Sequence, residues 1–191
     1  MNYEVEQKFP VANLAQLEHS LNELRATPGP VVEQIDQYYA HPAKDFAQSD
    51  EALRIRSVGD ENFLTYKGPK LDATTKTRQE IEVSLEPGKY GLERFSELLS
   101  ALGFRTVLEV RKVRRPFELR WQDRLVHAAL DQVAGIGCFV ELELVVGPEE
   151  VESAKACIAN LAENLQLAQP ERRSYLELLL ETTGPSANTR E

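Results

Sequence analysis

The sequence predicts an α+β fold: a closed, mainly antiparallel β-barrel, or tunnel, with helices packed outside it. Three observations lead to this prediction. Several segments alternate apolar and polar residues, which is the period of a half-buried strand. Other segments place apolar residues three and four positions apart, as amphipathic helices do. The polar positions of the strands are densely ionic, which favours a closed sheet with a polar interior and helices over its apolar side.

The predicted strands alternate apolar and polar residues and end at turn signals. They cover residues 3–9, 32–39, 52–58, 62–67, 77–85, 106–119, 124–131 and 138–146. Pro10 ends the first strand, and a polar loop at 68–76 precedes the fifth. Short turns are expected at 59–61, 122–123 and 134–137, so most strands follow one another directly, as in an antiparallel sheet.

The predicted helices cover residues 11–25, 92–102, 148–165 and 171–181. Asn13 is a candidate N-cap of the first helix, Gly103 a candidate C-cap of the second, and Pro148 opens the third. No repeat or linker divides the chain, so a single domain is expected over 1–182, followed by a disordered tail at 183–191.

Composition excludes several classes of function. The chain has 191 residues and a net charge of −9, which disfavours nonspecific binding to nucleic acid or acidic membranes. Its two cysteines form no CxxC motif and its three histidines no zinc-ligand pattern. The N-terminus lacks an apolar signal region, and no apolar run reaches the ~18–20 residues of a spanning helix. A cytoplasmic protein without nucleic-acid or membrane partners is expected.

The polar strand faces carry charges in same-sign pairs, because alternate residues of a strand share a face. The basic members are Lys8, Arg54, Arg56, Lys67, Arg78, Lys112 and Arg114. The acidic members are Glu4, Glu6, Glu80, Glu82, Asp131, Glu141 and Glu143. Such pairs repel unless an opposite charge lies between them. A polyphosphate would offset the Arg and Lys pairs, and Mg²⁺ or Mn²⁺ would offset the carboxylate pairs.

A solvated sheet with cross-strand salt bridges is the alternative interpretation. It explains mixed charges well and segregated same-sign pairs poorly, so a binding site is favoured. Glu80 and Glu82 could equally be structural partners of Arg78, since ion-pair networks resemble functional sites.

The ordered motifs resemble those of the CYTH superfamily, the triphosphate tunnel metalloenzymes. The N-terminal Glu4-Val-Glu6-Gln-Lys8 is similar to the ExExK signature of that family. The other matching segments are Asp36–Tyr39, Leu53–Arg56, Thr65–Pro69, Arg78–Glu82, Lys112–Arg114, Asp131 and Phe139–Glu143. The layout of residues 2 to about 180 is most similar to the class IV adenylyl cyclase branch.

The resemblance implies an eight-stranded tunnel that binds a triphosphate with Mg²⁺ or Mn²⁺. It implies that the metal-binding acids are Glu4, Glu6, Asp131, Glu141 and Glu143. It implies that the phosphate-binding residues are Lys8, Arg54, Arg56, Lys67, Arg78, Lys112 and Arg114. Relatives of the cyclase branch can dimerise, and a homodimer stays open here.

The resemblance favours a class IV-type adenylyl cyclase that converts ATP to cyclic AMP and pyrophosphate. The alternative enzyme is a hydrolase of thiamine triphosphate or tripolyphosphate, and Lys8 with Tyr38 resembles the Lys–Tyr pair of the thiamine triphosphatase branch. The candidate catalytic residues are therefore Lys8, Tyr38, Glu80 and Glu82. The cyclase branch has a His-Phe pair before ExExK that this sequence lacks. A triphosphate-binding module with little turnover is the non-enzymatic alternative.

Overall fold

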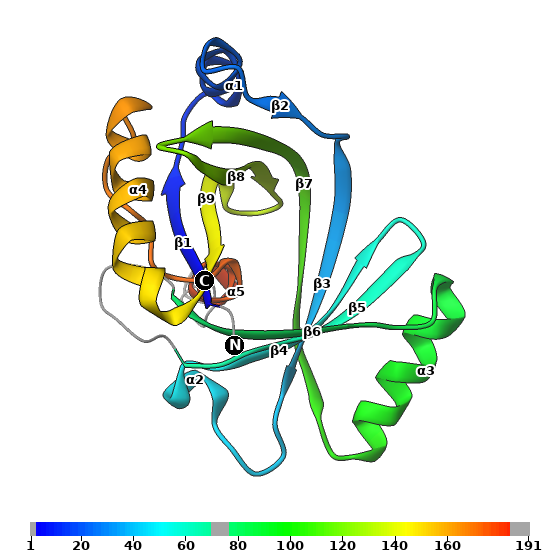
Figure 1. Cartoon of the computed structure of the whole chain (residues 1–191). Helices are drawn as coiled ribbons and strands as arrows, with labels where there is room; N and C mark the ends of the chain where they lie inside the picture. The colour runs from blue at the N-terminus through cyan, green and yellow to red at the C-terminus, as the bar shows by residue number, and fades with distance from the viewer. Residues whose placement is uncertain (1–2, 70–76, 184–191) are drawn as a thin grey trace, which may run out of the picture.

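The computed structural model describes residues 3–69 and 77–183. Its antiparallel sheet has the strand order β2-β7-β3-β4-β5-β6-β1-β9-β8, and β8 also pairs with β7. That last pairing closes the sheet (Figure 1). Because β2 is a two-residue addition beside β7, the barrel itself has eight strands, which confirms the predicted fold class.

The strands follow the alternating segments of the sequence closely. Their bounds are β1 Tyr3–Pro10, β2 Thr27–Pro28, β3 Val32–Ala40, β4 Ala52–Val58, β5 Glu61–Lys67, β6 Arg78–Ser84, β7 Arg105–Trp121, β8 Arg124–Val133 and β9 Gly137–Val146. Only β2 was not expected. The predicted loop 68–76 lies outside the described residues from position 70 onward.

The helices are α1 Leu14–Glu23, α2 Phe46–Ser49, α3 Gly88–Ala101, α4 Val151–Asn164 and α5 Tyr175–Thr183, with a 3₁₀ turn, η1, at Pro148–Glu150. Asn13 caps α1 by accepting a hydrogen bond from the Gln16 amide, as predicted. Gly103 follows the end of α3 with a φ of 89°. The four-residue α2 is too short to leave a periodic pattern. Positions 184–191 of the predicted tail lie outside the described residues.

Helices α1 and α4 cover one outer side of the barrel (Figure 1). Leu21 of α1 and Ile158 of α4 are fully buried in a core shared with strands β1, β7, β8 and β9. Helix α3 packs on another outer side, where Leu99 joins a cluster with Tyr39 and Ile55 of β3 and β4. No helix in the described ranges has both the length and the apolar character to span a membrane.

Helix α5 packs against the inner face of the barrel. Tyr175, at its first position, forms a buried cluster with Tyr38, Val110, Val133 and Phe139. Each of these strand residues lies opposite, or two positions from, a charged residue of the inner face in the strand register. The C-terminal helix therefore forms part of the wall of the interior (Figure 1).

Candidate active site: a charged cavity inside the barrel

Strand register brings the predicted charged residues onto one face. Residues directly opposite each other in an antiparallel pair point to the same side of a sheet. The opposed pairs include Glu6 with Glu143, Lys8 with Glu141, Asp36 with Arg56, Lys67 with Glu80, Glu4 with Arg78 and Arg114 with Asp131. This face is the interior of the barrel, since the opposite faces pack against α1, α3 and α4.

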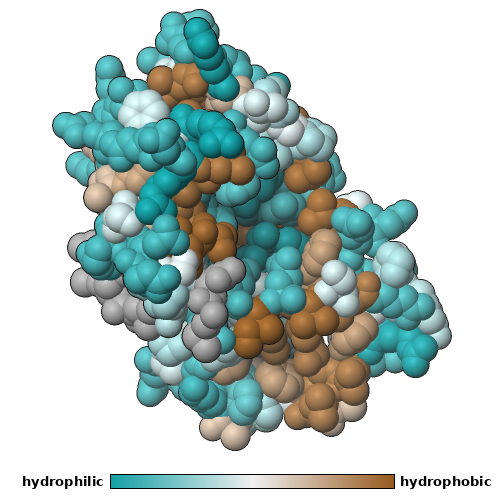
Figure 2. Space-filling view, viewed as in Figure 1, coloured by the Kyte–Doolittle hydropathy of each residue, from teal (hydrophilic) through white to brown (hydrophobic). Residues whose placement is uncertain are grey.

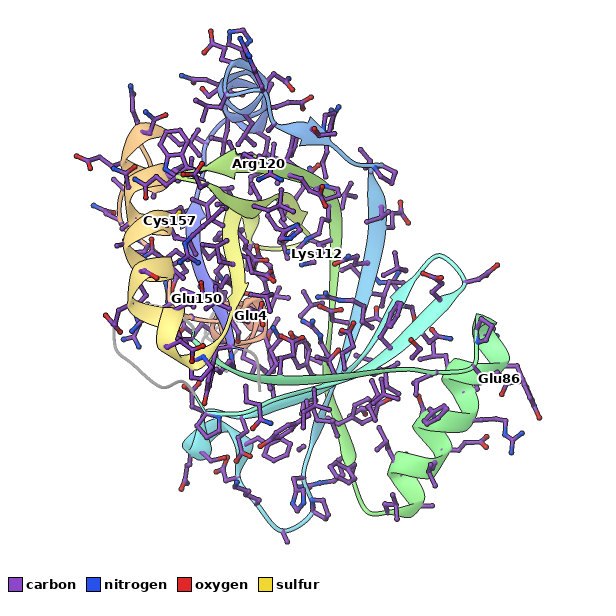
Figure 3. The ribbon with its side chains drawn as sticks, in the orientation of Figure 1. Glu4, Glu86, Lys112, Arg120, Glu150 and Cys157 are labelled. Carbon is purple, nitrogen blue, oxygen red and sulfur yellow. The ribbon has the colours of Figure 1, made fainter. Side chains whose placement is uncertain are left out.

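A cavity of about 960 Å³ occupies the interior, which is the size of a small-molecule site. The predicted site residues that line it are Glu4, Glu6, Tyr38, Arg54, Arg56, Lys67, Arg78, Glu80, Glu82, Lys112, Arg114, Glu141 and Glu143. Of the predicted set, Lys8 and Asp131 lie behind this lining. Hydrophilic residues surround a hollow in the space-filling view (Figure 2), and Glu4 and Lys112 reach the interior from strands β1 and β7 (Figure 3).

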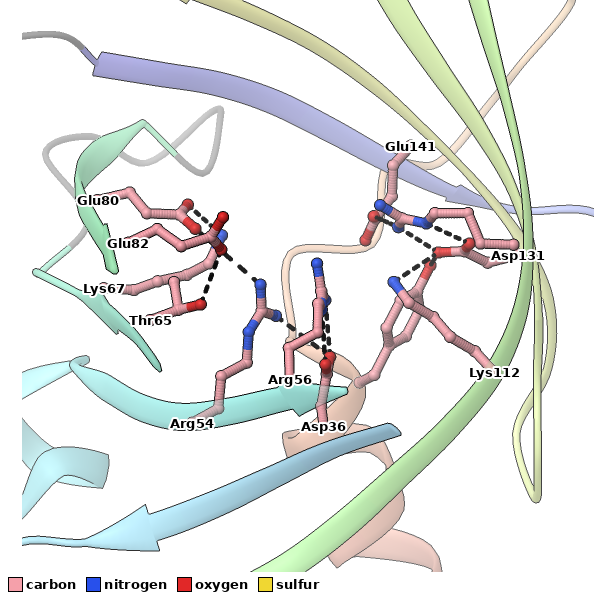
Figure 4. A network of polar contacts seen from close by, with 12 residues as sticks. Asp36, Arg54, Arg56, Thr65, Lys67, Glu80, Glu82, Lys112, Asp131 and Glu141 are labelled. Carbon is pink, nitrogen blue, oxygen red and sulfur yellow. Dashed lines mark hydrogen bonds and ion pairs between the residues drawn. The ribbon is translucent and has the colours of Figure 1, made fainter. Parts of the chain in front are cut away.

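Asp36 holds two arginines of the neighbouring strand β4. Its Oδ1 accepts a hydrogen bond from Arg56 Nε at 2.6 Å, and its Oδ2 accepts one from Arg56 Nη2 at 2.7 Å and one from Arg54 Nη1 at 3.3 Å (Figure 4). Burial favours the neutral carboxyl, but Arg54 and Arg56 outweigh it and hold the pKa of Asp36 well below its usual value. Asp36 is therefore a buried anion that orders two cations.

Lys67 links two carboxylates on the other side of the cavity. Its Nζ lies 3.0 Å from Glu4 Oε2 and 2.6 Å from Glu80 Oε2. Burial and the neighbouring Glu80 raise the pKa of Glu4, although Lys67 opposes the change. Burial also acts against ionised Glu80, but Glu4, Lys67 and Arg54 together lower the pKa of Glu80 to about 2. Glu80 thus stays ionised at neutral pH. Its ion pair is with Lys67 and not with Arg78, which lies two positions before it on β6.

Asp131 forms a second buried centre on strand β8. It accepts hydrogen bonds from Lys112 Nζ at 3.1 Å, Arg114 Nε at 2.7 Å and the Tyr175 hydroxyl at 2.9 Å. Arg114 also contacts Glu141 (Figure 4). Burial and the charge of Arg114 lower the pKa of Lys112 to about 8. The Lys112 ammonium is therefore close to its titration point near neutral pH.

Lys8 is turned toward the C-terminal segment. Its Nζ donates a hydrogen bond to the Arg173 carbonyl at 2.5 Å and lies over the Tyr175 ring. Lys8 is 1% exposed. Its roles as phosphate ligand and as partner of Tyr38 in catalysis stay predictions.

The remaining acids provide carboxylate oxygens, which are the ligands that Mg²⁺ or Mn²⁺ prefers. Burial and the nearby charges of Glu4 and Glu6 raise the pKa of Glu143 to about 8. Crowding of this kind is what a divalent cation would offset, and carboxylate oxygens are hard ligands. Within residues 3–69 and 77–183, no three acidic, histidine or cysteine side chains converge as ligands of one ion do. The carboxylates that line the cavity therefore fit a divalent metal chemically, and they would have to move closer together to bind one.

Asp36 and Tyr175 are site residues that the sequence analysis did not assign. Asp36 appeared in a matching motif without a role, and its position opposite Arg56 becomes visible only with the strand register. Tyr175 lies far along the chain from the strands, yet its hydroxyl reaches Asp131. His127 on β8 is about half exposed, with its Nδ1 3.9 Å from Glu118 Oε1.

The fold and site define a class of protein: a closed barrel whose interior presents both cations for a polyanion and carboxylates for a metal. A family model described as the CYTH domain matches residues 2–175, and the chain belongs to this family.

The relatives agree with this assignment. The chain is 36% identical over 148 residues to the Methanocaldococcus jannaschii protein named "Putative adenylate cyclase MJ0240". The matched residues make up 76% of this chain and 80% of that protein. The solved PH1819 protein of Pyrococcus horikoshii is 39% identical, with a TM-score of 0.82 over 94% of this chain and 99% of that one. A Hippeastrum protein described as "Putative adenylyl cyclase HpAC1", with "a dominant triphophatase activity", shares the fold at 18% identity and a TM-score of 0.67, over 95% of this chain and 96% of that one.

Proposed function

We propose that this protein is a divalent-metal-dependent enzyme that binds a triphosphate in the barrel and cleaves a phosphoanhydride bond, with the conversion of ATP to cyclic AMP and pyrophosphate as its reaction. The observation that carries the proposal is the shared cavity, where basic residues for phosphate and acids for metal line one space. Hydrolysis of a triphosphate is the alternative, and a binder with little turnover is the non-enzymatic one.

The basic residues supply the phosphate site. Arg54, Arg56 and Lys67 lie on adjacent strands β4 and β5, and Lys112 and Arg114 face the same cavity from β7. Arginine has several N–H donors in a planar fork, so an arginine that donates to Asp36 can also donate to a phosphate. Arg78 lines the same cavity, so six of the seven predicted basic residues face it, and Lys8 lies behind the lining. Their combined charge would stabilise the negative charge that collects on the leaving pyrophosphate.

The acids would hold the metal. Glu4, Glu6, Glu141 and Glu143 line the cavity on β1 and β9, which are adjacent strands. A divalent ion bound there would neutralise phosphate charge and lower the pKa of the attacking hydroxyl or water.

The need for a base that takes the proton of the nucleophile distinguishes the predicted catalytic residues. In the cyclase reaction the ATP 3′-oxygen bonds to the α-phosphorus, the bond to the β-phosphate oxygen breaks, and the hydroxyl proton passes to a base. Glu80 is a weak base because its pKa is about 2. Glu82 lines the cavity and accepts a hydrogen bond from Thr65 Oγ1 at 2.9 Å, and Tyr38 lines it as well. We therefore place Glu82 and Tyr38 next to the reacting hydroxyl or water.

The two reactions are separated by their products. The protein is incubated with Mg²⁺ or Mn²⁺ and, in separate reactions, with ATP, thiamine triphosphate and tripolyphosphate. Cyclic AMP with pyrophosphate identifies a cyclase, and orthophosphate without cyclic nucleotide identifies a hydrolase. If none of the three substrates gives a product but a triphosphate raises the melting temperature, the protein is either a binding module or an enzyme for an untested substrate. The Glu141→Gln variant is expected to lose turnover and keep its fold, and unchanged activity would overturn the metal assignment.

A further inference from the structure

Two buried aspartates have the same relation to the basic residues of the cavity. Asp36 lies directly opposite Arg56 in the β3–β4 register, and Asp131 lies directly opposite Arg114 in the β7–β8 register. Each aspartate also hydrogen-bonds the basic residue two positions away on that strand, Arg54 for Asp36 and Lys112 for Asp131. Each carboxylate therefore joins a same-sign pair whose members would otherwise repel one another.

The geometry of the two centres is alike. Both arginines donate through Nε and Nη2 to the two oxygens of their aspartate, at 2.6 and 2.7 Å for Arg56 and at 2.7 and 2.5 Å for Arg114. Such a bidentate contact fixes the plane of a guanidinium as well as its position. The two centres lie on neighbouring strands, since β3 pairs with β7 and Asp36 lies opposite Val110, two positions from Lys112 (Figure 4).

Burial separates these aspartates from the acids that line the cavity. Asp36 is 1% exposed and Asp131 is 0% exposed, and neither lines the cavity. Both oxygens of Asp131 already accept hydrogen bonds, from Lys112, Arg114 and the hydroxyl of Tyr175. A metal ligand would have to exchange these donors for the ion.

We propose that Asp36 and Asp131 are a matched pair of positioning residues that hold four cationic side chains ready for a triphosphate, and that Asp131 has this role in place of binding metal. The phosphate part of this inference rests on the proposed function. Long side chains that are already ordered lose less conformational freedom when the ligand binds, so the two aspartates raise affinity without touching the ligand.

The positioning role and a purely electrostatic role predict opposite effects of an Asp→Asn substitution on the affinity for a triphosphate. Replacing either aspartate with asparagine removes a negative charge from the site, and the higher positive potential alone would tighten anion binding. Asparagine offers one oxygen acceptor and cannot receive the bidentate contact. If preset geometry controls affinity, the same substitution weakens binding.

The test measures tripolyphosphate binding by calorimetry in EDTA, with Asp36→Asn, Asp131→Asn and the parent. We expect each variant to bind about tenfold more weakly than the parent. We also expect the Mn²⁺ concentration for half-maximal activity, measured with saturating triphosphate, to stay unchanged in both variants. Glu143→Gln is the matched control, because it should raise the Mn²⁺ requirement without weakening metal-free binding.

Unchanged or tighter binding by the asparagine variants would overturn the inference. So would a raised Mn²⁺ requirement in Asp131→Asn with intact metal-free binding, which would make Asp131 a metal ligand. If an asparagine variant fails to fold, Asp36→Glu and Asp131→Glu keep the charge and displace the carboxylate, and a similar loss of affinity is expected. A parent that binds but does not turn over would refute the proposed enzyme and leave this inference standing. A parent that does not bind tripolyphosphate in EDTA but turns over a triphosphate with Mn²⁺ would refute this inference and leave the proposed enzyme standing.

Discussion

The ammonium group of Lys8 lies against the face of Tyr175, with Nζ 4.0 Å from the ring centroid. These residues stand near opposite ends of the chain, one on β1 and the other at the start of α5. The contact is reinforced by the backbone, since the Glu171 amide donates to the Lys8 carbonyl at 2.6 Å. The first strand and the last helix are therefore fastened together beside the cavity.

Substitutions of Tyr175 should separate its two contacts. Tyr175→Phe keeps the ring under Lys8 and loses the hydrogen bond to Asp131, so the free energy of unfolding should fall by roughly 1.5–3 kcal/mol, the range for a hydrogen bond to a charged group. Tyr175→Leu also loses the cation–π contact and should cost about 0.5–2 kcal/mol more. Urea unfolding measures both values. Equal losses in the two variants would show that the aromatic face contributes nothing.

Arg54 tests whether the interior is a ligand site or only a salt-bridged barrel. In the parent, ATP should raise the melting temperature, because a ligand that binds only the folded state stabilises it. Arg54→Gln should lose most of this rise, since Arg54 lines the cavity. The matched control is Arg111→Gln, because the Arg111 side chain is 61% exposed and pairs with Glu109. A lower melting temperature with an undiminished response to ATP would support the structural interpretation.

The titration of Lys112 predicts a pH dependence of phosphate binding. Its pKa is lowered from 10.5 to about 8 by burial and by Arg114 and Arg56, although Glu141 and Asp131 oppose the change. Lys112 is therefore charged below about pH 8 and neutral above it, so metal-free affinity for ATP should fall as pH rises from 7 to 9. Lys112→Arg should make this profile shallower, since arginine stays charged, and Glu143, whose pKa is also about 8, accounts for the slope that is left. An equally steep profile in that variant would place the titrating group elsewhere.

Glu143 predicts that metal binding releases protons. Its pKa of about 8 means that the carboxyl is largely protonated at pH 7, and a metal ligand must be ionised. Calorimetry of Mn²⁺ binding in buffers of different ionisation enthalpy should show release of about one proton per ion. The affinity for Mn²⁺ should rise with pH up to about 8 and then level off. Glu143→Gln should abolish this part of the proton release, and a variant that still releases it would contradict the assignment.

Period-two alternation predicted the eight barrel strands and their inward charges. Arg54 and Arg56 share a face whichever strand lies beside them, so their orientation follows from local sequence. Their partner Asp36 does not follow in the same way, because it depends on the register between strands β3 and β4. This is why the sequence predicted the cations of the site and not the anion that orders them.

The placement of α5 could not be predicted for a related reason. Leu176, Leu178 and Leu179 predict a helix with an apolar face, and that face would look the same on either side of the sheet. In the structure these leucines pack against the inner-face cluster that includes Val133 and Phe139. Tyr175 consequently reaches Asp131, a contact that joins residues 44 positions apart.

Within residues 3–69 and 77–183, the longest pairing of strand β1 is with β9: the two share the register from Tyr3 to Pro10, whereas the described pairing with β6 covers Tyr3 and Glu4. During synthesis β1 therefore cannot form this pairing until β9, one of the last strands, has been made. At ~5–20 residues per second, the stretch from Pro10 to Gly137 takes roughly 6–25 s to emerge. Throughout that interval the nascent chain exposes Val5 and Phe9, which are buried in the finished protein. The N-terminal strand is thus a segment that a ribosome-bound chaperone would shield.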